Sequence, residues 1–360
     1  MGLLRVALAF AVLLSHLPPA TFKFISGGTA VQGFFVVSGF YMALVLDGKY
    51  KDTGLFYTNR LLRLLPAYFV MMAIAAVALF GFNASATASR EMFFDVYGHP
   101  ATAIAMGLEN LGLVGQDLLY WFRLPGDGVI QFDPTGAPPT DESPVAWQAL
   151  LVPQSWSLSL EIMFYALAPF LARLRWGWLA AICAGSIGLR LAGYLLPVDF
   201  GLWQGRFFPT ALFLFLLGML AQRALPLAER APKWAGFAAC ALALAMVAFL
   251  PMTKINGEIG RWLIYFGIAA TTPFIFTAFR NQTWDRWIGD LSYPIYLSHL
   301  IVIGVVLTFN LPLPVWTAIG GTLALSIALY LAVDRPVDRW RQVRAKQQNT
   351  PAPMEAVQPA

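Results

Sequence analysis

The chain has 360 residues, of which 58% are hydrophobic and only 12% are charged. Soluble domains are close to half apolar and about one quarter charged, so this composition excludes an ordinary water-soluble protein. The apolar runs are long and continuous, whereas strands of a membrane β-barrel alternate apolar and polar residues over segments of about ten. The net charge of +5 does not indicate a nucleic-acid partner, because the basic residues are spread thinly between apolar runs. We therefore expect an all-α integral membrane protein that has membrane lipids around it.

Apolar length predicts the membrane spans. A helix needs about 20 apolar residues to cross a bilayer, and ten segments qualify: residues 3–22, 28–46, 64–82, 155–172, 176–196, 207–222, 234–251, 261–279, 291–310 and 313–333. The first also fits a cleaved signal peptide ending near Ala20, but His16 followed directly by more membrane sequence favours a retained helix. Residues 1–340 then form one membrane domain, and residues 341–360 are expected to be a disordered cytoplasmic tail.

The distribution of basic residues predicts the orientation. If the spans alternate from an inside N-terminus, most Lys and Arg residues fall on the inner side, as the positive-inside rule requires. Both termini are therefore expected in the cytoplasm, and the long segment 83–154 is expected outside it. Residues 101–124 are apolar but contain Glu109, Asp117 and Arg123, so we predict a re-entrant or interfacial helix. A true span there would invert the orientation of everything that follows.

Two ionisable residues of the first span are functional candidates, because such residues are costly inside a membrane. Arg5 and His16 are eleven positions apart, so they share one helical face and are separated by about 16 Å along the axis. A neutral imidazole near the middle of the membrane can act as a general base toward a hydroxyl. A histidine hydrogen-bonded between helices is the alternative.

The second and third spans hold further candidates. Arg60 and Arg63 are three apart on one helical face, and guanidinium groups bind phosphate oxygens in a bidentate manner. An ordinary topology signal has the same appearance, so both interpretations stay open. A packing role would be enough to account for the small residues of the second span, which let backbones approach closely, but a functional role stays open. These residues are Gly27, Gly28, Gly33, Ser38 and Gly39.

The fourth and fifth spans each carry a buried charge. Ser157, Glu161 and Tyr165 are spaced by four and share one helical face. Arg190 is expected at the same depth as Glu161. Because only a short turn separates the two spans, we predict that they are antiparallel neighbours and that these side chains neutralise each other.

The ninth span contains Tyr296 and His299. His299 fits packing as well as it fits chemistry. No Cys or His cluster with metal-ligand spacing occurs, so no metal site is expected.

Six motifs, taken in order along the chain, resemble those of the membrane-bound acyltransferase-3 family. They are Arg5 and His16 with ten residues between them, FFVVSGF (34–40), RLLRLLP (60–66), WSLSLEIMFY (156–165), SYPIYLSH (292–299) and DRPVDRW (334–340). Each motif is weak alone, but their order and spread make the set specific. One position departs from the pattern. Many members have Asp two residues before the paired Phe, where this chain has Gln32, so no role of that Asp is transferred.

The resemblance implies a ten-helix enzyme of the bacterial inner membrane. Such an enzyme moves an acyl group, usually acetyl from cytoplasmic acetyl-CoA, to a hydroxyl of a surface or exported glycan or of a lipid-linked sugar. It implies essential roles for Arg5, His16 and the pair Arg60 and Arg63, and our hypothesis is that the three arginines bind the phosphates of the acyl-CoA. His16 then either deprotonates the acceptor or carries the acyl group transiently, and Glu161 orients the imidazole or the acceptor. The path of the substrates is expected to involve Ser38, Ser157, Arg190, Tyr296 and His299.

A transporter or flippase for a glycan or lipid intermediate is the alternative function, because it also needs a polar path through ten helices. The paired inner cations, aligned with a histidine in the membrane, favour an enzyme that uses a phosphate-bearing donor.

Overall fold

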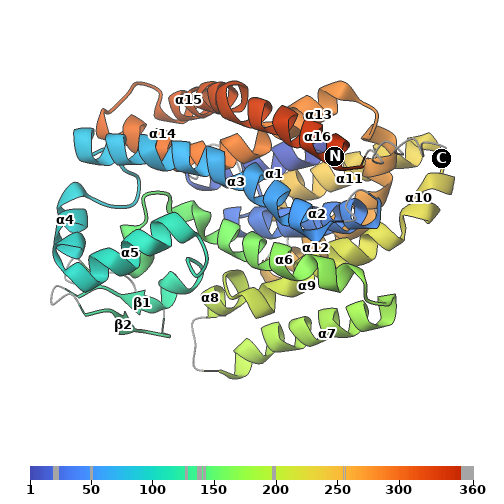
Figure 1. The fold of residues 1–360 in the computed structure, drawn as a ribbon, viewed down its shortest axis with the longest axis horizontal. Helices are drawn as coiled ribbons and strands as arrows, with labels where there is room; N and C mark the ends of the chain where they lie inside the picture. Colours follow the sequence, from blue (N-terminus) through green and yellow to red (C-terminus); the bar gives the residue numbers. More distant parts are fainter. Residues whose placement is uncertain are drawn as a thin grey trace, which may run out of the picture.

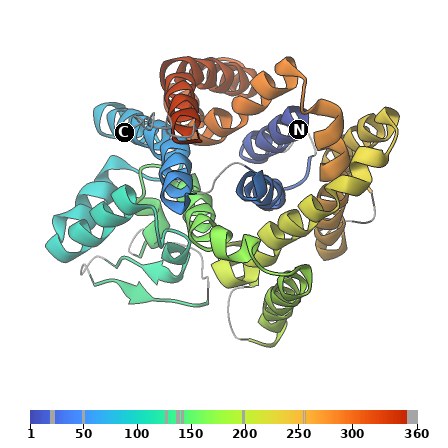
Figure 2. The same cartoon turned by 45° about the vertical axis from the view of Figure 1, so that its right-hand side comes forward.

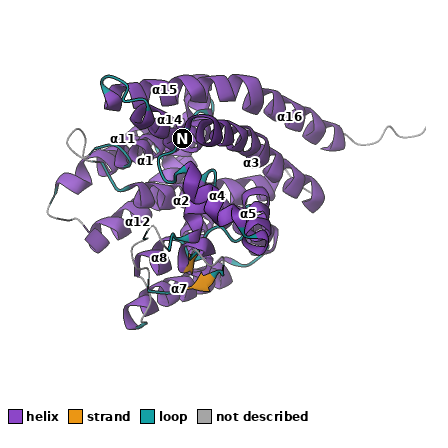
Figure 3. Ribbon diagram, turned by 90° about the vertical axis from the view of Figure 1, so that its left-hand side faces the viewer, coloured by secondary structure: helices purple, strands orange, loops and turns teal. Residues whose placement is uncertain are grey.

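The computed structural model describes residues 1–18, 24–48, 52–125, 129–135, 140, 143–196, 200–253, 255 and 257–349. Within these ranges the chain is almost entirely helical, and the sheet they contain has two short strands (Figure 3). The predicted end of the first span at residues 19–22, which includes Ala20, lies outside the described residues. The prediction of an all-α membrane protein is confirmed.

Nine helical stretches of the described chain are long and apolar enough to cross a membrane, and a shorter apolar helix, α1 (Gly2–Ser15), precedes them. Each of these ten overlaps one predicted span. The main helices of the nine are α2 (Gly27–Gly48), α3 (Thr53–Ala76), α6 (Trp156–Ala172), α7 (Trp176–Ala192), α9 (Phe208–Arg223), α11 (Lys233–Phe249), α12 (Gly257–Phe279), α14 (Ser292–Thr308) and α15 (Pro314–Leu329).

Shorter elements connect and extend these helices. The remaining α-helices are α4 (Arg90–Gly98), α5 (Pro100–Gly112), α8 (Phe200–Gly205), α10 (Leu225–Arg230), α13 (Thr283–Asp290) and α16 (Arg335–Asn349). Strand β1 (Phe122–Arg123) pairs antiparallel with β2 (Gln131–Phe132). Single 3-10 turns occur at Leu118–Trp121, Ala146–Ala149, Pro153–Ser155, Gly193–Leu195 and Leu250–Met252, and π-helical turns at Val77–Gly81 and Tyr330–Asp334.

The molecule has two ends, which we call the N-terminal end and the loop end. Figure 1 shows the N-terminus, α13 and α16 toward one end, and α4, α5 and the two strands at the other. In Figure 2, α1 and α2, drawn in the darkest blues, lie near the middle with later helices around them. Helix α5 has 13 residues and ends at Gly112, and the next residue, Leu113, has a left-handed φ of 62°. Residues 101–124 therefore do not form one spanning helix, as expected from their charges.

Two glycines bring α2 and α9 into backbone contact. A Cβ atom at Gly39 would lie 1.9 Å from the carbonyl oxygen of Phe215, and one at Gly218 would lie 1.9 Å from that of Val36. No larger residue fits at either position, so the packing role predicted for the small residues of α2 is confirmed at Gly39. A Cβ atom at Gly28 would meet nothing within 4 Å, so packing does not explain that glycine.

Helix α16 corrects part of the tail prediction. The expectation of disorder from residue 341 onward is wrong for residues 341–349, which continue α16, while 350–360 lie outside the described residues. The guanidinium of Arg341 donates to Asp338 in the same helix at 2.6 Å and to the carbonyl oxygen of Asn59 in α3 at 3.1 Å. This contact with α3 is tertiary, so the polar composition of the segment did not indicate it.

Candidate active site

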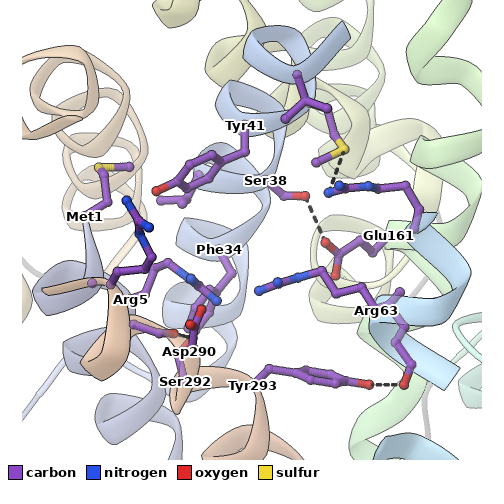
Figure 4. A pocket seen from close by; sticks show the side chains of 18 of the residues that line it. Met1, Arg5, Phe34, Ser38, Tyr41, Arg63, Glu161, Asp290, Ser292 and Tyr293 are labelled. Atoms are coloured by element: carbon purple, nitrogen blue, oxygen red, sulfur yellow. Dashed lines mark hydrogen bonds between the residues drawn. The ribbon is translucent and has the colours of Figure 1, made fainter. Parts of the chain in front are cut away.

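A cavity of about 560 Å³ opens at the N-terminal end between α1, α2, α3, α6, α12, α13, α14 and α16 (Figure 4). The fold thus gathers residues that are far apart in the sequence. Seven of the ten predicted site residues line the cavity: Arg5, Ser38, Arg60, Arg63, Ser157, Glu161 and Tyr296. The other three predicted residues, His16, Arg190 and His299, are not part of its lining.

Three predicted arginines reach the cavity from two helices. Arg5 lies on α1 and Arg63 on α3, at opposite sides of the cavity (Figure 4). Arg60 is one turn before Arg63, and its guanidinium lies 5.9 Å from the ring centre of Phe56. Asp52 caps the start of α3 by accepting from the amide of Gly54 at 2.8 Å, so both α3 arginines lie inside a regular helix. In the described part of the chain, none of the three forms an ion pair with a carboxylate.

Glu161 is held in the cavity by two hydroxyl groups. Its Oε1 atom accepts from Ser38 of α2 at 2.9 Å and from Tyr165, one turn along α6, at 2.5 Å. The predicted shared face of Glu161 and Tyr165 is therefore confirmed. Ser157 lies on the same face, since it lines the cavity too, and it also contacts α14. Among the described residues Glu161 makes no hydrogen bond with His16, so the carboxylate does not orient the imidazole directly.

His16 follows directly on the end of α1, and its side chain is exposed. Its Nδ1 atom lies 2.9 Å from the carbonyl oxygen of Val12. A carbonyl oxygen only accepts, so in the neutral ring Nδ1 carries the hydrogen and Nε2 keeps its lone pair. This is the tautomer that a general base needs. Helix α1 has 14 residues, which places His16 about 21 Å along the axis from its start.

A hydrogen-bonded pair of hydroxyl groups lines the cavity close to two histidines. The Tyr296 hydroxyl bonds to the Ser157 hydroxyl at 2.7 Å and donates to the carbonyl oxygen of Gln154 at 2.6 Å. One turn further along α14, His299 lies with its ring centre 5.0 Å from that of His16. The structure thus places side by side two histidines that the sequence analysis treated separately. His299 is also next to Tyr296, which lines the cavity.

The predicted pairing of Arg190 with Glu161 is wrong. Arg190 is buried and donates to the carbonyl oxygen of Gln204 at 2.5 Å, while its guanidinium also lies over aromatic rings. Helix α7 packs against α9, where Ser186 donates to the carbonyl oxygen of Pro209 at 2.6 Å. The short turn after α6 therefore does not make α6 and α7 close neighbours. Arg190 lies outside the cavity lining, and the path predicted for it is not supported.

Gln32 belongs to the Arg190 cluster. Its Oε1 atom accepts from Arg190 at 3.2 Å and from the hydroxyl of Tyr265. Its Nε2 atom donates to the carbonyl oxygen of Gln204 at 3.3 Å. Gln32 therefore stabilises a buried cation between α2, α7 and α12, and it does not line the cavity.

Sequence reasoning missed three residues near these sites. Tyr41 and Asp290 line the cavity, and Asp290 lies just before the SYPIYLSH motif, which was the available signal. The third residue is Arg206. Its guanidinium lies 3.4 Å from the ring centre of Tyr120 and 4.4 Å from that of Trp156. Within the described residues, no group of three or more His, Cys, Asp or Glu side chains is placed to hold a metal.

Comparisons with known proteins match the same region of the chain. The exopolysaccharide production protein ExoZ of Rhizobium meliloti (strain 1021) is 25% identical to this chain over 337 residues, which cover 89% of the chain and 92% of the relative. No solved structure gives a significant match. The family described as "Acyltransferase domain" matches residues 1–333, which include the cavity helices α1 to α14 and both histidines. The chain therefore belongs to this acyltransferase family.

Proposed function

We propose that this acyltransferase takes an acyl group, acetyl in the simplest case, from acyl-CoA on the cytoplasmic side and transfers it to a hydroxyl of an exported or surface glycan. The main supporting observation is that Tyr296, which lines a cavity rich in arginine, lies beside His299, and that His299 lies beside His16. The fold thereby places a potential anion-binding site, the cavity arginines, near a potential proton acceptor, His16.

The charges of the cavity suit a phosphate-bearing donor. Six arginines line it, against four carboxylates: Arg5, Arg60, Arg63, Arg280, Arg286 and Arg341 against Glu161, Asp285, Asp290 and Asp338. Arg280 and Arg341 are ion-paired with Glu229 and Asp338. Arg5, Arg60 and Arg63 form no ion pair among the described residues, so their guanidinium groups can bind the phosphate oxygens of coenzyme A in a bidentate manner. The cavity opens at the N-terminal end, which the distribution of basic residues predicts to be cytoplasmic.

His16 supplies the base for transfer. The acceptor hydroxyl gives its proton to the free Nε2 of His16 while its oxygen attacks the thioester carbon. The new O–C bond forms as the C–S bond breaks, and the departing thiolate takes the proton from His16. Attack by Nε2 itself, giving an acyl-histidine before the acceptor arrives, uses the same lone pair. Glu161 faces the cavity and orients the donor or the acceptor rather than the imidazole.

The choice of acceptor rests on the exposed position of His16 and on the similarity to ExoZ, a protein named for exopolysaccharide production. A polymer or lipid-linked sugar is too large for the cavity, so we place it on the outer side of His16. The donor arm then approaches from the cavity, and the two substrates meet at the histidine pair.

Membranes containing the protein, radiolabelled acetyl-CoA and polysaccharide from a strain that lacks the gene test this proposal. We expect label to enter the polysaccharide as a base-labile ester, and His16→Ala to abolish this while normal amounts of protein remain in the membrane. Undiminished esterification by His16→Ala would refute the catalytic role. Movement of glycan across the membrane with no consumption of acetyl-CoA would identify a flippase instead.

A further inference from the structure

His299 carries a buried hydrogen-bond acceptor that nothing in the described structure satisfies. The residue is 0% exposed. Its Nδ1 atom lies 2.7 Å from the carbonyl oxygen of Tyr296, so in the neutral ring Nδ1 carries the hydrogen and Nε2 holds a lone pair. This Nε2 atom has no hydrogen-bond partner among the described residues. Buried polar atoms are almost always paired in proteins, so this unpaired nitrogen requires an explanation.

The ring of His16 lies next to that of His299. Their centres are 5.0 Å apart and their planes are tilted by 50°. Each ring has its Nδ1 hydrogen engaged with a backbone carbonyl, so each presents a bare lone pair at Nε2. Two lone pairs do not bond to each other. Once His16 takes a proton at Nε2, it becomes a donor, and a bond of about 2.9 Å between ring nitrogens fits a ring separation of about 5 Å.

The surroundings of His16 make such a partner valuable. The guanidinium of Arg206 is held between Tyr120 and Trp156, and its positive charge acts on His16. A second positive charge on the imidazole is therefore costly at the moment when His16 accepts the proton. A neutral hydrogen-bond acceptor beside the protonated imidazole offsets that cost. The neutral His16 ring does not make this interaction.

The geometry points to His299 as a positioning residue that accepts a hydrogen bond from protonated His16 during acyl transfer. The inference rests on the proposed function. In the transfer step the acceptor O–H bond breaks, its proton binds Nε2 of His16, the O–C bond forms and the C–S bond breaks. The proton on His16 is shared with Nε2 of His299 until the thiolate removes it, so His299 is neutral before and after the step. An interaction present only then raises kcat without improving substrate binding.

Two substitutions of His299 separate its two nitrogens. In His299→Asn the amide N–H can still donate to the carbonyl oxygen of Tyr296, but no group remains at the position of Nε2. In His299→Gln the longer amide places an acceptor oxygen near that position. With radiolabelled acetyl-CoA and unacylated polysaccharide as substrates, we expect kcat to fall roughly tenfold to a hundredfold in His299→Asn, with KM for acetyl-CoA unchanged. We expect His299→Gln to recover a substantial part of the loss.

Ser298→Ala is the matched control, because Ser298 is adjacent on α14 but bonds to Ser326 of α15. It should leave kcat near the wild-type value. Affinity of the purified variants for acetyl-CoA, measured without acceptor, reports folding independently of transfer. The inference is overturned if His299→Asn keeps full kcat. It is also overturned if both His299 variants lose acetyl-CoA affinity or protein level together, which identifies a packing role. Absence of transfer by the wild type would refute the proposed function itself.

Discussion

The hydroxyl groups of Ser157 and Tyr296 lie 2.7 Å apart and close the inner end of the cavity by joining α6 to α14. On the cavity side of this contact are the arginines and Glu161. On its other side, the ring centre of His299 lies 5.9 Å from that of Tyr296. A donor in the cavity must therefore pass or displace this wall for its thioester to reach the histidines.

The first prediction concerns this wall. Tyr296→Phe removes the hydroxyl that holds Ser157 and the carbonyl oxygen of Gln154, so the thioester end of the donor is positioned less well. We expect kcat to fall by about tenfold with a small effect on the amount of protein. Tyr57→Phe is the control, since it also removes a bond to a carbonyl oxygen, that of Ala166, but lies outside the cavity lining. Equal effects of the two substitutions on kcat would contradict this role.

The second prediction concerns the donor. Arg60→Ala and Arg63→Ala should each weaken acetyl-CoA binding by roughly tenfold or more, and Lys at either position should restore it only in part. An ammonium is a point charge and cannot form the two parallel bonds of a guanidinium with phosphate. Isothermal titration of the detergent-solubilised variants measures this directly. Arg173→Ala, an exposed residue between α6 and α7, should bind normally. Normal affinity of an Arg60, Arg63 double variant would leave these residues as topology signals.

Helical periodicity predicted the local parts of the site. Arg60 and Arg63 share a face at a spacing of three, and Tyr165 reaches Glu161 at a spacing of four. Apolar length predicted the spans for the same reason, because a bilayer requires about 20 consecutive apolar residues whatever the tertiary fold. The six motifs identified the family together, whereas no single residue would have identified it.

The contacts between distant helices were not predictable in this way. Ser38 donates to Glu161 only because α2 packs against α6. His299 lies beside His16 only because α14 packs against α1. The error at Arg190 has the same origin. A short turn was taken to make α6 and α7 neighbours, whereas α7 packs on α9 and Arg190 finds carbonyl, amide and aromatic partners there.

The third prediction is the orientation. If the N-terminal end is cytoplasmic, a cysteine at exposed Gln131 in β2 should react with an impermeant maleimide added to intact cells, because this strand lies at the loop end. A cysteine at exposed Arg173 should react only after permeabilisation. The native Cys183 and Cys240 are buried, so background labelling should be low. Labelling of Arg173→Cys but not of Gln131→Cys in intact cells would reverse the arrangement.

The fourth prediction tests the buried cation. Gln32→Leu removes the side-chain oxygen that accepts from Arg190 and Tyr265, which leaves a buried charge with fewer partners. We expect a loss of about 2 to 4 kcal/mol in unfolding free energy, seen as a lower Tm in detergent. Gln32→Glu keeps an acceptor at Oε1 and should retain more stability than Gln32→Leu. An unchanged Tm for Gln32→Leu would show that the aromatic rings and Gln204 suffice for Arg190.

The last prediction concerns pH and the loop end, outside the membrane spans. Burial raises the pKa of Asp117 to about 6 although Ser159 donates to its carboxylate at 2.7 Å. The folded state therefore takes up this proton at a higher pH than the unfolded chain, whose Asp has the usual value of 3.8. The free energy of unfolding therefore decreases as the pH rises from 3.8 to about 6, and it stays lower above pH 6.

Asp117→Asn keeps an oxygen for Ser159 and removes the buried charge. We expect the variant to match the wild type in Tm at about pH 4 and to exceed it at about pH 8, by an amount that grows across that interval. Glu109, whose pKa is raised to about 7 by burial and by the charge of Asp117, should ionise more easily in this variant. Asp95→Asn, an exposed residue of α4, serves as the control. A Tm difference between Asp117→Asn and wild type that is the same at both pH values would show that the Asp117 carboxylate is not the group responsible.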